Sequence, residues 1–168
     1  MHIARYLKPA HIKLELASGH LATMAPDKDP ERERIRLKEE VVAELVDLFM
    51  RTGQIRNRNK FHHDLLSRER KATTAIGNAI ALPHVRSLQP RGVAAIFARS
   101  RVGVEYLALD GAPVKIFFGI AAPSYDDRIF LQFYKWIAQR LLEEEWLPQA
   151  LLEAADEHEI IRLLSSLR

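Results

Sequence analysis

The chain contains no cysteine among its 168 residues. This absence excludes a disulfide scaffold, a thiolate metal site and a cysteine nucleophile. A membrane span needs about 20 apolar residues, and the longest apolar run, residues 114–123, is shorter and is interrupted by Lys115. The first residues also lack the apolar stretch of a signal peptide. We therefore expect a cytoplasmic protein that is not inserted in a membrane.

Carboxylates are missing from the middle of the chain. Residues 71–104 carry five basic side chains and no Asp or Glu, whereas residues 105–168 carry six basic and eleven acidic side chains. A segment without carboxylates repels a bound anion less than the rest of the chain does. The whole chain has a net charge of +3, with 48% hydrophobic and 28% charged residues. These values are typical of one globular domain, which we expect to span residues 1–168.

Motifs of several enzyme classes are absent as well. The chain has no Walker A loop, no G-x-G-x-x-G dinucleotide motif, no G-x-S-x-G elbow and no H-E-x-x-H zinc motif. The pair His62-His63 precedes Asp64, but adjacent side chains on a helix diverge by about 100° and could not easily share one ion. We expect no cofactor and no metal.

Hydrophobic periodicity predicts helices at both ends of the chain. Residues 11–16 alternate like a half-buried strand, residues 18–30 are predicted to be a loop, and the wider region 18–34 resembles a loop insertion before the first helix. A helical period begins at Glu31 and ends near Gly53, a typical C-cap, and a second helix covers residues 61–70. Helical patterns return from residue 126 and at 147–154. Asp156 and Glu159 form a capping box that opens a last helix.

Strands are predicted between these helical blocks, at residues 79–82, 92–98, 104–107 and 114–121. The dipeptide Asp110-Gly111 predicts a hairpin that joins the last two strands. Helices on either side of a block of short strands predict an α/β fold, in which one small mixed β-sheet is flanked by helices.

His84 differs from the other histidines in its surroundings. It follows a short apolar strand, where loops of α/β proteins place functional groups, and Pro83 stiffens the backbone before it. A neutral imidazole can attack phosphorus, and nearby donors and cations can hold the anionic product. His84 is therefore either a phosphoryl acceptor or a histidine hydrogen-bonded at a strand end. The hydroxyl and guanidinium groups suited to phosphate oxygens are those of Thr73, Thr74, Ser87, Arg68 and Arg86.

The segment LLSRERKATTAIGNAIALPHVR at residues 65–86 closely resembles the signature of the fructose/mannitol-type enzyme IIA domains of the bacterial sugar phosphotransferase system. That family includes the nitrogen-regulatory IIA proteins, and the resemblance extends over most of the chain. It implies an α/β sandwich and a histidine phosphorylated by the phosphocarrier HPr or its nitrogen-branch counterpart. On this pattern His84 matches the phosphorylated histidine, Arg68 the arginine beside it, and Thr73 or Thr74 the bordering hydroxyl.

The resemblance also implies a downstream partner, either a IIB domain or a regulatory target protein. Family members that pass phosphate to a sugar permease usually carry a second histidine that opens the long helix after the last strand. Here that position is Phe130, with Arg128 nearby. Because phenylalanine cannot share a proton with a phosphohistidine, we expect a phosphotransferase-system component that acts as a regulatory switch more than as a sugar carrier.

Two other hypotheses remain open from the sequence. The loss of a histidine at Phe130 also suits a IIA-like module that binds a partner without phosphorylation. The isoelectric point near 9.3 and the basic run 51–60 could indicate a nucleic-acid-binding protein. That run is more simply explained as a solvated turn, and the chain has no RNP-type aromatics and no helix-turn-helix pattern. We therefore expect no nucleic-acid partner.

Overall fold

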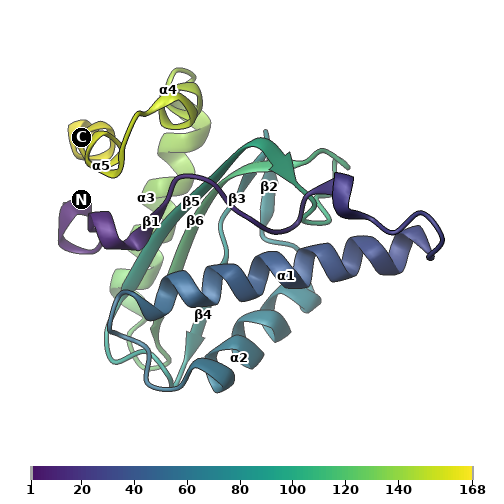
Figure 1. Cartoon of the computed structure of the whole chain (residues 1–168). Helices are drawn as coiled ribbons and strands as arrows, with labels where there is room; N and C mark the ends of the chain where they lie inside the picture. Colours follow the sequence, from purple (N-terminus) through teal and green to yellow (C-terminus); the bar gives the residue numbers. More distant parts are fainter. Residues whose placement is uncertain (1, 168) are drawn as a thin grey trace.

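The computed structural model describes residues 2–167 and has a mixed β-sheet at its centre (Figure 1). The sheet order is β1-β5-β6-β3-β2, and β4 also pairs with β6. Its long strands, β5 and β6, run antiparallel, while β3 and β4 pair in parallel with successive parts of β6. The strands are β1 Ile12–Lys13, β2 Ala75–Gly77, β3 Ile80–Ala81, β4 His84–Ser87, β5 Ala94–Val104 and β6 Val114–Pro123. The α/β class and the small mixed sheet predicted from the sequence are confirmed.

Helices cover both faces of this sheet (Figure 1). On one face lie α1 (Pro30–Met50) and α2 (Arg58–Lys71), and on the other lie α3 (Asp127–Glu143), α4 (Leu147–Glu153) and α5 (Glu157–Ser166). Alternate side chains of β5 enter the two layers, since Phe97 packs in the core under α3 and Ile96 packs in the core under α1. Burial on both faces explains why these strands are almost continuously apolar.

The helix ends follow local sequence signals. Asp29 caps α1 by accepting a hydrogen bond from the backbone N–H of Glu31 at 3.1 Å, and the next residue is a proline, which suits a first helical turn. Half of the predicted capping box at α5 is present, because Asp156 accepts from the N–H of Glu159 at 2.7 Å, whereas the bond of the Glu159 side chain goes to the residue before the cap. The carboxylate of Glu159 reaches back to the N–H of Ala155, at 2.7 Å.

Several predicted boundaries are wrong. Residues 30–34 belong to α1, so the helix begins one residue before the predicted Glu31 and the last part of the predicted insertion 18–34 is helical. The first strand contains only Ile12–Lys13 rather than residues 11–16. The predicted strands 92–98 and 104–107 are replaced by one strand, β5, which bends at a bulge near Gly103 and ends at Val104.

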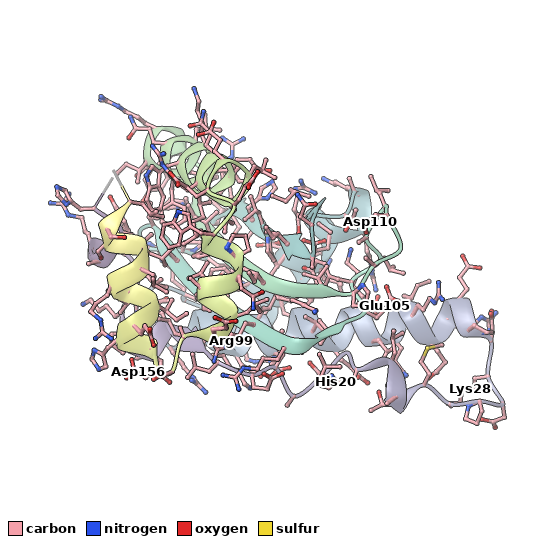
Figure 2. All side chains as sticks on the ribbon, turned by 90° about the horizontal axis from the view of Figure 1, so that it is seen from above. His20, Lys28, Arg99, Glu105, Asp110 and Asp156 are labelled. Atoms are coloured by element: carbon pink, nitrogen blue, oxygen red, sulfur yellow. The ribbon has the colours of Figure 1, made fainter. Side chains whose placement is uncertain are left out.

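The predicted hairpin is confirmed with a longer connection. Val104 pairs with Val114, and the residues between them leave the sheet. The N–H of Gly111 donates to the carbonyl of Ala108 at 2.9 Å, and Asp110 accepts from the N–H of Ala112 at 3.0 Å. The Asp110-Gly111 turn therefore lies at the tip of this connection, where Figure 2 labels Asp110.

Arg99 connects the C-terminal helices to the sheet (Figure 2). Its side chain is buried in β5 and donates hydrogen bonds to the carbonyls of Leu151 and Ala154, at 2.7 and 2.8 Å. A third bond goes to the carbonyl of Leu14 at 2.8 Å. Because these carbonyls lie at the end of α4 and beside β1, one guanidinium fixes both elements against β5. In the part of the chain that the structure describes, no helix combines the length and hydropathy needed to cross a bilayer.

Candidate functional site

His84 is the first residue of β4, where it pairs with Ile120 of β6. The sequence placed it in a loop after a strand, and this placement is wrong. Pro83 has no N–H to donate to the sheet, so the chain interrupts its pairing between β3 and β4. The sheet resumes at once, because the carbonyl of Pro83 accepts from the N–H of Ile120 at 2.9 Å. His84 is therefore held at a break in the edge of the sheet, with its side chain half-buried.

The imidazole of His84 has a defined tautomer. Its Nδ1 lies 2.7 Å from the carbonyl oxygen of Leu82. A carbonyl can only accept, so Nδ1 carries the proton and the other ring nitrogen, Nε2, has its lone pair available. Arg68 completes the arrangement, since its Nη2 lies 3.1 Å from Nε2 and donates to it.

Arg68 is itself held in place at the end of α2. Its Nη1 donates to the carbonyl of Ala72 at 2.9 Å, just beyond the last turn of the helix. One guanidinium thus satisfies a free carbonyl at the helix terminus and faces the imidazole with its other nitrogen. The sequence predicted Arg68 and His84 as site residues, and the structure brings their side chains into contact.

The pKa of His84 lies below the ordinary value of a histidine. Burial is the largest cause, because it penalises the charged imidazolium. The Leu82 carbonyl acts in the opposite direction, and the positive charge of Arg68 lowers the pKa further. The imidazole is therefore neutral at pH 7, and its Nε2 lone pair is available to an electrophile.

Two aromatic rings of α3 pack against the imidazole. The ring centroid of Tyr134 lies 4.8 Å from that of His84, in an edge-on arrangement, and the centroid of Phe130 lies 5.9 Å away. Phe130 was identified from the sequence as the residue at the second-histidine position, and it contacts the predicted acceptor. Tyr134 was missed, although its position one helical turn after Phe130 is a signal that could have found it.

A cleft of about 1160 Å³ opens beside His84, between α2 and β4. His84, Arg68 and Arg86 all line it, so three of the predicted site residues share one surface. The guanidinium of Arg86 lies 5.9 Å from the ring centroid of Phe130. Ser87 and Ser124 add hydroxyl groups to the wall. Among the side chains that the structure describes, no three of His, Asp or Glu are grouped as metal ligands.

Thr73 and Thr74 lie outside the lining of this cleft. Thr74 is buried, and its hydroxyl donates to the carboxylate of Glu69. The hydroxyl of Thr73 lies 3.5 Å from Nζ of Lys38 and 3.4 Å from the carbonyl oxygen of Tyr106. The structure therefore places neither hydroxyl in the lining of the cleft beside His84.

The threonines belong to a buried charged cluster that the sequence did not reveal. Lys38 of α1 forms an ion pair with Glu69 of α2 at 3.0 Å, with side-chain exposures of 8% and 0%. Thr74 links this pair to the histidine, since its carbonyl accepts from the N–H of Leu82 at 2.9 Å and Leu82 in turn holds His84. The cluster supports the backbone that orients the imidazole.

Known proteins resemble this chain over most of its length. The family model described as "Phosphoenolpyruvate-dependent sugar phosphotransferase system, EIIA 2" matches residues 32–167. The fructose-specific EIIA component of Haloferax volcanii is 30% identical over 128 residues, which are 76% of this chain and 82% of that protein. The fructose-specific EIIABC component of Bacillus subtilis is 34% identical over 128 residues, again 76% of this chain. The chain spans only 20% of the length of that larger protein.

Solved structures show the same fold at lower sequence identity. The nitrogen regulatory protein IIA-Ntr from Neisseria meningitidis superposes with a TM-score of 0.80 at 21% identity, covering 98% of this chain and 99% of the other. The mannitol IIA of Escherichia coli, solved in a complex with phosphorylated IIB, gives a TM-score of 0.71 at 18% identity, covering 95% and 96%. With the family match over residues 32–167, these likenesses show that the chain belongs to the EIIA type 2 family of the phosphoenolpyruvate-dependent sugar phosphotransferase system.

Proposed function

We propose that the chain accepts a phosphoryl group on Nε2 of His84 from an HPr-like phosphocarrier. The observation that carries this proposal is the pair of contacts at the imidazole. The Leu82 carbonyl keeps the proton on Nδ1, and Arg68 stands 3.1 Å from Nε2, on the cleft side. The proposal deepens the family assignment by naming the acceptor atom in this chain.

Phosphoryl transfer at this site is balanced without any further reactant. The P–N bond of the carrier's phosphohistidine breaks as a P–N bond to Nε2 of His84 forms. The proton on Nδ1 stays where it is, and the Leu82 carbonyl at 2.7 Å stabilises the positive charge that the ring gains. The guanidinium of Arg68 offsets the charge of the phosphoryl oxygens. Transfer to a recipient is the reverse of the same step.

The downstream partner is either a IIB domain or a regulatory target. The mannitol IIA of Escherichia coli forms a complex with its phosphorylated IIB, which supports the first option. Phe130 favours the second, because a phenylalanine next to His84 offers the phosphoryl group neither a proton nor a hydrogen bond. We infer that phosphorylation serves chiefly as a signal, in which the partner senses a dianion in the cleft. We propose that the chain meets these carriers in the cytoplasm.

A labelling experiment tests the proposal. The chain is incubated with phosphoenolpyruvate, enzyme I and an HPr-type carrier, and its intact mass is measured before and after mild acid. We expect one acid-labile phosphoryl group in the wild type and none in His84→Ala. His158→Ala, which alters a histidine of α5 outside the cleft lining, should label fully. Undiminished labelling of His84→Ala would refute the site. A wild type that binds its partner yet takes no phosphate would favour the phosphorylation-independent module.

A further inference from the structure

The rim of the His84 cleft is strongly basic. Among the described residues that line it, Asp64 is the one carboxylate, beside five basic or imidazole side chains other than His84. Lys60 and Lys71 are exposed on α2, at opposite ends of the helix. Neither has an ion-pair partner among the described residues. By contrast, two arginines of the same helix are neutralised, because Arg58 pairs with Asp47 at 2.7 Å and Arg70 with Glu39 at 2.5 Å. The five are Lys60, His63, Arg68, Lys71 and Arg86.

The basic surface continues past the cleft onto the turn between α1 and α2. This turn packs against the segment that follows β4, through a bond from the N–H of Arg56 to the carbonyl of Gln89 at 3.0 Å. A second bond joins the N–H of Arg91 to the carbonyl of Gln54 at 2.8 Å. The side chains of Arg56 and Arg91 are exposed there. Two segments far apart in sequence thus add exposed arginines next to Gln89, which lines the cleft.

The apolar side chain of Leu88 lies among the basic residues that line the cleft. Leu88 lines the cleft and is 72% exposed, although it follows directly on β4. Phe130 contributes a second apolar contact next to the imidazole. An apolar contact point inside a charged rim is typical of protein–protein interfaces. The side chain of Leu88 has neither a charge nor a hydrogen-bond donor for the phosphates of a nucleic acid. The residues of the cleft therefore favour a protein partner.

We propose that the His84 cleft docks proteins that present an apolar contact for Leu88 inside a ring of carboxylates. This inference rests on the proposed function, because it specifies which carriers can reach His84: the phosphodonor of this chain has an acidic surface around its own phosphohistidine. Complementary charge accelerates encounter and rejects partners with the wrong sign. A carrier with lysines around its histidine is repelled by Lys60, Lys71 and the adjoining arginines.

The test uses one HPr-type carrier in two forms. Exposed side chains around its histidine are glutamates in one form and lysines in the other. The rate of phosphoryl transfer to the full chain is measured for both forms between 50 and 500 mM NaCl. We expect the glutamate form to transfer about tenfold or more faster at the lowest salt, with the advantage shrinking as salt screens the charges.

Charge reversal on the receiving side provides the matched comparison. The variant Lys60→Glu/Lys71→Glu should lose about tenfold in rate with the glutamate form and gain with the lysine form. The control Lys28→Glu/Lys115→Glu changes the net charge equally. Lys28 lies in the loop before α1 (Figure 2) and Lys115 near the start of β6, away from the cleft lining. This control should match the wild type.

The outcomes separate this proposal from the proposed function. If His84 is phosphorylated equally fast by both carriers, or faster by the lysine form, the acidic-partner proposal is overturned and the acceptor site stands. Calorimetry with His84→Ala measures binding when no phosphate can be transferred to His84. If the glutamate form binds this variant, and the binding depends on Lys60 and Lys71, the docking surface is supported independently of the acceptor site. Tighter binding of a DNA duplex through the same two lysines would overturn it in favour of a nucleic-acid site.

Discussion

Nδ1 of His84 lies 2.7 Å from the carbonyl oxygen of Leu82, two residues earlier in the chain. Pro83 stands between them, and its ring fixes one backbone angle and restricts the residue before it. The backbone therefore holds the carbonyl of Leu82 against the imidazole of His84. This hydrogen bond determines which ring nitrogen keeps the proton. The proposal that Nε2 is the acceptor therefore rests on three consecutive residues.

Replacing Arg68 should slow phosphorylation without unfolding the chain. In Arg68→Met the guanidinium next to Nε2 is lost, and with it the positive charge that offsets the phosphoryl oxygens. We expect the rate of phosphoryl transfer to fall by about 10²–10³-fold. Arg68→Lys keeps the charge but not the geometry and should recover part of the rate. A rate for Arg68→Met equal to that of wild type, measured by intact mass over time, would show that Arg68 has no part in the step.

The pKa of His84 should depend on the aromatic ring of Tyr134, which packs against the imidazole. Tyr134→Ala exposes the imidazole to water, and because burial is the main cause of the lowered pKa, the pKa should rise toward the ordinary 6.5. Leu131→Ala, at a side chain 58% exposed on the same helix, is the control and should leave the pKa unchanged. Titration of the ring signals by NMR measures both variants. An unshifted pKa in Tyr134→Ala would contradict the burial argument.

The same lowered pKa predicts how stability changes with pH. Below pH 6.5, the ordinary pKa of a histidine, His84 binds a proton in the unfolded chain but is still neutral in the folded chain. The unfolded state then holds more protons, so the free energy of unfolding falls as the pH falls until the folded pKa is reached. His84→Asn should show a weaker loss between pH 6.5 and that pKa. Denaturant titrations at a series of pH values give the comparison, and equal slopes for the two proteins would refute it.

The ion pair behind the histidine should be costly to break. Lys38→Met leaves the carboxylate of Glu69 buried without its cation, and we expect a loss of about 3–5 kcal/mol in the free energy of unfolding. The double variant Lys38→Met/Glu69→Leu removes both charges and should lose less than Lys38→Met alone. Arg70→Met breaks the more exposed pair with Glu39, at side-chain exposures of 64% and 35%, and should cost at most about 1 kcal/mol. A double variant less stable than Lys38→Met would count against a buried-charge penalty.

Much of this fold could be predicted from the sequence because its elements carry local signals. The apolar period of α1, the helix cap at Asp156 and the turn at Asp110-Gly111 each depend on a few neighbouring residues. The errors occurred where tertiary pairing decides. β4 exists because β6 extends past β3 and offers its edge to His84, and no local pattern records that pairing. β5 reaches Val104 because Arg99 and Val104 pair with Ile116 and Val114 of β6, on either side of a register shift.

The candidate site was predictable to a similar degree. Arg68 and His84 were both predicted from one short segment, residues 65–86. The structure joins their side chains. Thr73 and Thr74 were predicted from the same segment, but their hydroxyl groups contact Lys38 and Glu69 respectively. The direction of a side chain near a turn depends on backbone angles that the sequence does not specify, such as the positive φ of Asn78 and Ala79. Tyr134 required the docking of α3 to be known.

Restoring a histidine at Phe130 should favour transfer to a IIB domain. In Phe130→His an imidazole replaces the ring whose centroid lies 5.9 Å from that of His84, so the phosphoryl group gains a hydrogen-bond donor. We expect transfer from phosphorylated chain to a fructose-type IIB domain to speed up by about tenfold or more. Phe130→Leu, which keeps an apolar group there, should transfer as the wild type does. Equal rates for the histidine and leucine variants would mean that residue 130 does not limit transfer.

The central claim is that His84 accepts phosphate on Nε2 because Leu82 holds the proton on Nδ1. Phosphorus and nitrogen NMR of the chain, labelled with ¹⁵N in its histidines and phosphorylated through enzyme I and an HPr-type carrier, identifies the bonded nitrogen. Our account predicts a single phosphorus resonance coupled to Nε2 of His84, with Nδ1 still protonated. A phosphoryl group on Nδ1 of His84, or on another histidine, would contradict it.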